Sequence, residues 1–124
     1  MLNIVCVNWR NYQGKGEEYV RRLRIGIARH ATAPYTFKVF DDDDLPFGLT
    51  GWYNKLYLFQ RGLFNEDDHV LYFDLDTIIL QNIDDLLTLR DDFAILRDFM
   101  SPTKWGSGIM SWSVKYMNSI APYN

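Results

Sequence analysis

Residues 69–80 read HVLYFDLDTIIL, and this stretch decides the fold class. Its first part, His69–Phe73, has the continuous apolar and aromatic character of a buried strand. Two aspartates, Asp74 and Asp76, follow directly in an expected Asp-Leu-Asp-Thr turn. In an extended chain, residues two apart point the same way and lie about 6.6 Å apart. We therefore expect both carboxylates to address one site at the end of a strand, with Leu75 turned into the core.

Two carboxylates at this spacing suit a hard divalent cation. Mn²⁺ or Mg²⁺ takes oxygen ligands from one or two carboxylates, and water and substrate phosphates complete its coordination. The alternative is that the acids only cap and solvate a turn. An unmatched charge at the end of an apolar strand is costly, and this favours a metal site with Asp74 and Asp76 as ligands.

Further strands and helices are expected on both sides of this stretch. The expected strands are Leu2–Val7, Tyr35–Phe40, Phe93–Arg97 and Ile109–Trp112, the expected helices are Glu17–Ala31, Trp52–Leu63, Ile83–Leu89 and Val114–Ile120, and polar loops are expected at Asn8–Gly16 and Asp41–Gly51. In the first helix Ile25 falls on the polar side, against the pattern. Strands alternating with helices predict an α/β domain with a mostly parallel sheet flanked by helices, and ligands bind beyond the carboxyl ends of such strands.

Size and composition limit the classes of protein to consider. The 124 residues fit a single domain over 1–124, and with 48% hydrophobic and 16% aromatic residues the chain can build a real core. No apolar run approaches the ~18–20 residues that span a bilayer, so we expect no membrane span. The N-terminus lacks the pattern of a signal peptide, and a single cysteine, Cys6, cannot form an internal disulfide. These features predict a cytoplasmic protein.

Charge is distributed unevenly along the chain. Residues 1–40 carry seven basic side chains against two acidic ones, whereas residues 41–124 carry six against fourteen. A protein that binds nucleic acid usually presents a basic surface overall. An acidic second half suits a chain that collects a divalent cation better, so nucleic acid is not an expected partner.

Four segments carry a resemblance to a known family. They are IVCVNWRNY (4–12), GWYNKLYLF (51–59), VLYFDLDTIIL (70–80) and WGSGIMSW (105–112). In this order they resemble the nucleotide-sugar-binding half of a GT-A-fold glycosyltransferase, nearest to glycosyltransferase family 8 and its glycogenin-like relatives. The resemblance covers most of the chain. It implies a GT-A-type, Rossmann-like domain that uses a UDP-sugar, UDP-glucose or UDP-galactose, in a shortened relative without the C-terminal acceptor-binding half.

The resemblance implies roles for the charged residues of these segments. Asp76 would be the principal metal ligand, and Asp74 would contact metal-bound water, the ribose or the sugar. Lys55 would bind the donor phosphates and stabilise the leaving diphosphate. A third metal ligand, a histidine, comes in this family from a later segment. His30 and His69 both lie outside the matching region and are expected to be structural.

The resemblance also implies where the nucleotide base would bind. Val7, Asn8 and Trp9 fall at the end of the first strand, where the family holds the base with main-chain atoms. Tyr12 falls at the position of a stacked aromatic side chain, which suits an uncharged pyrimidine. The run Asp41–Asp44 is either a solvated loop or contains an acid close to the base or ribose.

The last matching segment would line the donor sugar. Ser107 and Gly108 match a turn that contacts the sugar in the family, and Gly106 stands where the family has asparagine. Asp98 matches an acidic position near the donor sugar, and we expect it to be a catalytic residue together with Lys55. A surface acid is the alternative for Asp98.

Three functions compete at this point. The leading one is a minimal metal-dependent hexosyltransferase with an unknown acceptor, which hydrolyses donor in isolation or shares an acceptor site between subunits of a homo-oligomer. The second is a non-catalytic nucleotide-sugar-binding module. The third is a haloacid-dehalogenase-type phosphatase with Asp74 as nucleophile. That class carries its D-x-D-x-T after the first strand and needs a later acidic pair, for which Asp91 and Asp92 are poorly placed.

Overall fold

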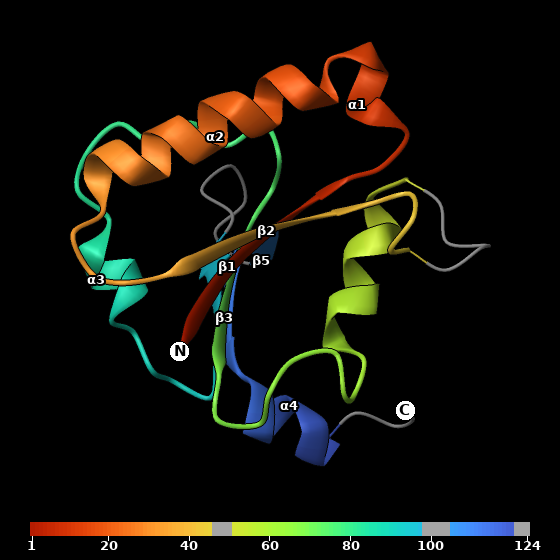
Figure 1. Cartoon of the computed structure of the whole chain (residues 1–124). Coiled ribbons are helices and arrows are strands. Elements are labelled where there is room, and N and C mark those ends of the chain that lie inside the picture. The colour runs from red at the N-terminus through yellow and green to blue at the C-terminus, as the bar shows by residue number, and fades with distance from the viewer. Residues whose placement is uncertain (46–50, 98–104, 121–124) are drawn as a thin grey trace.

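The computed structural model describes residues 1–45, 51–97 and 105–120. Its elements are β1 (Leu2–Asn8), α1 (Asn11–Gly14), α2 (Gly16–His30), β2 (Thr36–Asp41), the 3₁₀ helix η1 (Gly51–Phe59), β3 (His69–Phe73), α3 (Asp84–Leu87), β4 (Phe93–Arg97), β5 (Trp105–Ser113) and α4 (Val114–Ile120). The described strands form one sheet in the order β2-β1-β3-β5-β4 (Figure 1). The predicted α/β architecture with flanking helices is confirmed.

Among the described strands β2, β1, β3 and β4 run in the same direction and β5 runs against them, so the sheet is mostly parallel, as predicted, with one reversed strand. β1 pairs in parallel with β2 and with β3, whereas β5 runs antiparallel to both β3 and β4. A parallel connection needs a crossover of a dozen or more residues, and α2 provides one between β1 and β2. The chain between β4 and β5 is too short for such a crossover, so these neighbours pair in opposite directions.

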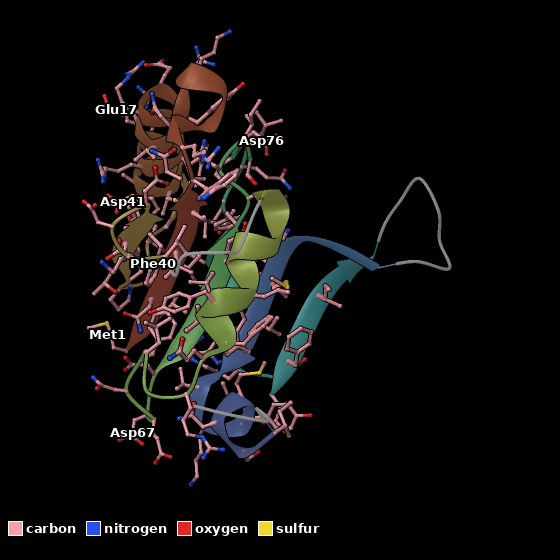
Figure 2. The ribbon with its side chains drawn as sticks, turned by 90° about the vertical axis from the view of Figure 1, so that its right-hand side faces the viewer. Met1, Glu17, Phe40, Asp41, Asp67 and Asp76 are labelled. Carbon is pink, nitrogen blue, oxygen red and sulfur yellow. The ribbon has the colours of Figure 1, made fainter. Side chains whose placement is uncertain are left out.

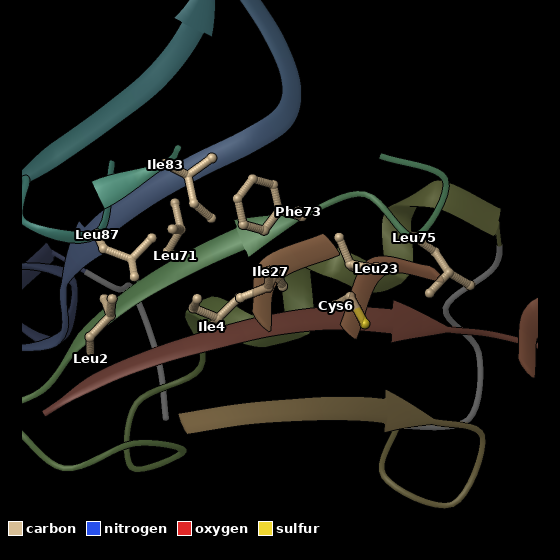
Figure 3. Packing of buried hydrophobic residues seen from close by; sticks show 10 residues of the cluster. All are labelled: Leu2, Ile4, Cys6, Leu23, Ile27, Leu71, Phe73, Leu75, Ile83 and Leu87. Carbon is tan, nitrogen blue, oxygen red and sulfur yellow. The ribbon is translucent and has the colours of Figure 1, made fainter. Parts of the chain in front are cut away.

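One face of the sheet is covered by α2 and α3. Alternate residues of β1 and β3 point to this face, as expected for a side-chain period of two. Figure 3 shows the resulting core, made by Leu2, Ile4, Cys6, Leu23, Ile27, Leu71, Phe73, Leu75, Ile83 and Leu87. Leu75 is buried here, as predicted from its place between the two aspartates.

The other face of the sheet carries a second core beneath η1 and α4. It is made by Val5, Phe40, Leu58, Val70, Tyr72, Met110, Trp112, Val114 and Met117. The Phe59 ring stands edge-on to the Trp112 ring, with 4.8 Å between centroids. Because Tyr72 points to this side, the polar end of its side chain lies on the η1 side of the sheet.

Several predicted boundaries differ from the structure. The helix predicted for Trp52–Leu63 is a 3₁₀ helix that ends at Phe59, and Gly62 beyond it has a left-handed φ of 87° that no helix continues through. Within the predicted loop Asn8–Gly16 the short helix α1 forms. β5 is longer than predicted, because pairing with two neighbours extends it past the apolar run. No helix of the described residues is long and apolar enough to cross a membrane.

Asp84, the first residue of α3, ties this helix to the chain that follows α2. Its carboxylate accepts hydrogen bonds from the backbone N–H groups of Thr32 at 2.8 Å and Ala33 at 3.0 Å, and also from the Thr32 hydroxyl. These donors favour the charged form and lower the pKa of Asp84. The carboxylate thus joins segments that lie far apart in the sequence.

We expect acid to weaken this tie. Because the folded pKa of Asp84 is depressed, its stabilisation is complete above the unfolded pKa of about 4 and is lost as the pH falls through the folded value. Asp84→Asn should therefore melt at a lower temperature than the parent at pH 7, and the difference should shrink below about pH 4. Thermal denaturation from pH 7 to pH 3 measures this, and a difference that does not change with pH would contradict it.

Candidate functional site

The carboxyl ends of β1, β2 and β3 lie at one edge of the sheet, because these three strands run in the same direction. β5 runs the opposite way, so its first residues return to this edge. In Figure 2, Asp76 and Glu17 lie at this end of the molecule, whereas Met1 and Asp67, which precede β1 and β3, lie at the other end. This edge is where ligands bind in open α/β sheets.

Asp74 makes the central contacts at this edge. Its Oδ1 accepts a hydrogen bond from the Tyr72 hydroxyl at 2.6 Å and one from Lys55 Nζ at 3.2 Å. Its backbone N–H donates to the Gly108 carbonyl at 2.8 Å. A Cβ added at Gly108 would lie 3.2 Å from Asp74 Oδ2. The structure therefore brings together three predicted site residues, Asp74, Lys55 and Gly108.

Lys55 and Asp74 form an ion pair of unequal exposure. The lysine side chain is 8% exposed, whereas the aspartate side chain is 40% exposed. Lys55 Nζ also lies 5.4 Å from the centroid of the Tyr72 ring, a cation–π distance. A buried ammonium requires such partners, because leaving it uncompensated is strongly destabilising. A buried cation therefore holds a carboxylate that still faces solvent.

Tyr72 also belongs to the cluster around Asp74 and Lys55, and it was not among the predicted site residues. Burial, followed by the charge of Asp74, raises the pKa of Tyr72, so its hydroxyl stays protonated and donates to Asp74. One signal was present in the sequence, since Tyr72 precedes Asp74 by two residues and side chains at that spacing share a face. However, the apolar pattern of a strand does not distinguish a tyrosine with a role in a site from one that only packs in the core.

Asp76 lies in a turn and not in extended chain. The Thr77 N–H donates to the Asp74 carbonyl at 3.0 Å, which closes a turn over Asp74–Thr77. The predicted extended spacing of the two aspartates is therefore wrong, because the chain direction changes between them. The charge of Asp76 still contributes to the raised pKa of Tyr72, after burial and Asp74. Both carboxylates thus act electrostatically on the same hydroxyl.

The two carboxylates at this edge fit a hard cation that takes its remaining ligands from water or from a bound molecule. Asp74 Oδ1 is held by protein donors, while Oδ2 lies beside Gly108, which has no side chain of its own to cover it. Asp76 is exposed and offers a second carboxylate. In the part of the chain that the structure describes, no three His, Cys, Asp or Glu side chains gather as a metal site. A cation here would need oxygen atoms from a ligand such as a diphosphate.

The histidines differ in their surroundings. His69 Nε2 lies 2.6 Å from Ser111 Oγ, and the residue is buried on the paired strands β3 and β5. Burial lowers the pKa of His69, which keeps its ring neutral. The structural role predicted for His69 agrees with this environment, at the opposite end of β3 from Asp74. His30 ends α2 and lines a groove described below.

The end of β1 lies against the start of α2. Val7, Asn8 and Trp9 are half-buried. Asn8 Oδ1 is buried and has no hydrogen-bond partner among the described residues. It would lie 2.0 Å from a Cβ at Gly16, so only glycine fits there. The structure thus turns the Asn8 side chain toward α2, and the roles of these three residues in holding a base stay predictions.

The next two residues have unusual backbone geometry. Arg10 and Asn11 have left-handed φ values of 51° and 50°. Such residues cost on the order of 1 kcal/mol each and persist where the surroundings hold them. Here the Arg10 N–H donates to Asp42 Oδ1 at 2.7 Å, and Asn11 Oδ1 accepts from the Glu17 N–H at 3.2 Å. The loop at the strand ends is therefore held by the residue that follows β2 and by α2.

The remaining predicted site residues are placed less fully. Tyr12 lies in α1 and Ser107 in β5, but the structure describes neither side chain. Asp98 lies outside the described residues. The roles of these residues in stacking, sugar contact and catalysis stay predictions.

Comparisons with known proteins identify the fold. The sequence matches no protein-family model and no curated protein. The structure is similar to the apo-form glycosyltransferase GlyE of Streptococcus pneumoniae TIGR4, with a TM-score of 0.69 and 16% identity over 94% of this chain. It is also similar to the galactosyltransferase LgtC, solved with donor and acceptor sugar analogues, with a TM-score of 0.65 and 14% identity over 94% of this chain.

This chain spans 35% of the GlyE chain and 59% of the LgtC chain. Identities this low establish the fold and leave assignment to glycosyltransferase family 8 a prediction. The chain has the GT-A-like, mixed α/β fold of these glycosyltransferases.

Proposed function

We propose that this chain binds a UDP-sugar together with Mn²⁺ or Mg²⁺ and transfers the sugar. The observation that carries the proposal is the state of Asp74 at the end of β3. One of its oxygens is fixed by Tyr72 and Lys55, and the other lies beside a glycine. The same edge of the sheet also presents the exposed carboxylate of Asp76. The likeness of the fold to two glycosyltransferases supports this class of reaction over the phosphatase.

The chain's own residues would act by charge and position. Asp76 and Asp74 Oδ2 would hold the cation, which supplies positive charge that stabilises the leaving diphosphate. Lys55 holds the Asp74 carboxylate at 3.2 Å and fixes its direction, and its ammonium would add a second positive charge beside the diphosphate. Tyr72 donates to the same carboxylate oxygen, so Asp74 is oriented before any ligand arrives.

The nucleotide and the sugar would occupy the remaining parts of this edge. Val7, Asn8, Trp9 and Tyr12 would contact the base, and Ser107, Gly108 and Asp98 the donor sugar. Since LgtC is a galactosyltransferase, UDP-galactose is the first donor to test, followed by UDP-glucose. The acceptor is unknown, so donor hydrolysis, in which water takes the sugar, is the reaction to measure first.

Metal-dependent binding of UDP tests the proposal directly. We expect UDP with Mn²⁺ to raise the melting temperature, because a ligand at 100 times its Kd stabilises the folded state by about 2.7 kcal/mol. UDP alone should produce little change. Asp76→Asn should abolish the increase. Asp67→Asn should retain it, because it makes the same chemical change in an exposed residue at the opposite end of the molecule (Figure 2).

The possible outcomes separate the three functions. No shift for UDP with Mn²⁺ would contradict a UDP-sugar site altogether. A shift without release of UDP from either UDP-sugar would favour the non-catalytic module. Hydrolysis of p-nitrophenyl phosphate that depends on Asp74 would favour the phosphatase.

A methyl group at Gly108 should disturb the same site. In Gly108→Ala the added carbon would lie 3.2 Å from Asp74 Oδ2, closer than an ordinary contact, so the carboxylate must shift by a few tenths of an ångström. Changing a neighbour that positions a metal ligand typically weakens metal binding by about 10- to 100-fold. We expect metal-dependent UDP affinity to fall by about tenfold, measured by titration calorimetry with Mn²⁺. Unchanged affinity in a folded variant would argue against Oδ2 as a ligand.

A further inference from the structure

A groove of about 390 Å³ lies between α2 and the segment that follows the Asp74–Thr77 turn. Three arginines and three isoleucines are among the residues that line it: Arg21, Arg22, Arg29, Ile25, Ile78 and Ile79. Asp76 also lines the groove, which therefore lies next to the candidate donor site. The groove is accordingly both basic and apolar.

The two sides of the groove are held in register by a close contact. A Cβ at Gly26 would lie 3.2 Å from Ile79 Cβ, so the segment packs directly against the α2 backbone. The groove also accounts for Ile25, which falls on the polar side of the helical pattern. This side chain is half-buried and faces the groove together with the isoleucines of the segment. Its position reflects an apolar surface along the groove, which joins the first core through Ile79.

The arginines of α2 differ in how they are paired. Arg21 and Arg22 contact Glu18 at 2.6 and 3.0 Å. Arg29 has no hydrogen bond or ion pair within residues 1–45, 51–97 and 105–120. Arg24 lies over the Phe37 ring at 5.2 Å and does not line the groove. Arg29 is therefore the groove cation best able to take an anionic ligand.

Apolar surface continues beyond the groove on the same segment. Ile78 is 78% exposed, and Leu80, two residues later, is 81% exposed. Large apolar side chains this exposed and adjacent to arginines suit a ligand that carries an anionic group on an apolar body. Phosphate fits the anionic group because the planar fork of a guanidinium binds two of its oxygens at once.

We propose that this groove binds the phosphate group of an amphiphilic molecule, with Arg29 taking the phosphate and Ile25, Ile78 and Ile79 contacting the apolar part. The groove adjoins the candidate donor site through Asp76, but the proposed binding requires neither UDP nor a metal ion. The phosphate group has two sources, a phospholipid headgroup and a soluble phosphate ester. The experiment below distinguishes these sources.

The first measurement is cosedimentation with vesicles of phosphatidylglycerol, with phosphatidylcholine vesicles as the neutral control. The second is titration with hexyl phosphate, a soluble phosphate ester with an apolar chain, followed by the backbone amide NMR signals of residues 21–30 and 76–79. Arg29→Gln should weaken binding by about fivefold, the effect of one basic residue near an anionic surface. The matched control Arg24→Gln removes the same charge from the same helix and should change binding by less than about twofold. Both arginines are exposed, so both variants should fold.

Vesicle binding that depends on Arg29 and not on Arg24, and that falls in Ile78→Ser, would support a lipid headgroup. Arg29-dependent changes in the amide signals with hexyl phosphate, without vesicle binding, would support a soluble ester. Equal losses in Arg29→Gln and Arg24→Gln would show only general attraction to a basic helix and would overturn the proposal. Failure of both probes to bind would overturn it as well. UDP binding is measured separately, so its failure leaves these outcomes unchanged.

Discussion

Asp76→Asn should lower the metal-dependent release of UDP from UDP-galactose by about 100- to 1,000-fold, the usual cost of removing one group that stabilises transition-state charge. Asparagine keeps the size of the side chain and one oxygen but loses the charge that a hard cation prefers. Because Asp76 is exposed and in a turn, the substitution should leave the melting temperature nearly unchanged. Loss of activity with retained stability is the expected combination.

The measurement is the rate of UDP release at several Mn²⁺ concentrations. If Asp76 is a metal ligand, a higher Mn²⁺ concentration should restore part of the activity of Asp76→Asn. Asp67→Asn is the matched control and should behave like the parent chain. Activity of Asp76→Asn at the parent level and the parent Mn²⁺ requirement would remove Asp76 from the site. An equal loss in Asp67→Asn would point to a general effect of charge.

Lys55→Met should reduce both stability and activity. Methionine retains most of the apolar volume but leaves Asp74 without its buried cation. Breaking a buried ion pair costs about 3–5 kcal/mol, but Asp74 is 40% exposed and solvent compensates part of the loss. We therefore expect a loss of about 1–3 kcal/mol in the free energy of unfolding, measured by urea denaturation. UDP release should fall by about 100-fold, because the carboxylate is no longer oriented.

Two further variants show how Lys55 acts. Tyr72→Phe removes the other donor to Asp74 Oδ1 and should cost about 1 kcal/mol, less than Lys55→Met. In a double-mutant cycle, a lysine that works only through Asp74 should have little further effect on activity once Asp74→Asn is present. A second full loss would instead assign Lys55 a direct contact with the donor phosphates. Parent stability and activity in Lys55→Met would contradict both roles.

Much of the secondary structure could be predicted from local pattern. The strand His69–Phe73 matches its predicted bounds, and the long helix agrees within one residue at each end. Apolar runs and helical periodicity are properties of neighbouring residues, so a sequence displays them directly. The direction of β5 could not be predicted in the same way, because an apolar strand does not encode the direction of its partner.

The candidate site was predicted in part. Asp74 was identified from its place at the end of an apolar strand, and Lys55 and Gly108 through the resemblance to a family. The structure places the three residues in contact or close to it. Tyr72 was not predicted, because its role depends on the position of its hydroxyl group in the folded structure. The turn over Asp74–Thr77 was predicted, but the extended spacing expected of Asp74 and Asp76 was wrong, because the Thr77 N–H closes the turn on the Asp74 carbonyl.

The sequence by itself determined which segments become strands and helices and which acids follow the central strand, since short-range sterics and hydrophobic periodicity control both. Only the tertiary structure decided that Lys55 meets Asp74 across 19 residues of chain and that the start of β5 returns beside it. Strand order and strand direction bring these groups together. Both depend on the simultaneous packing of the two faces of the sheet. The partners of the central carboxylate are therefore a consequence of packing.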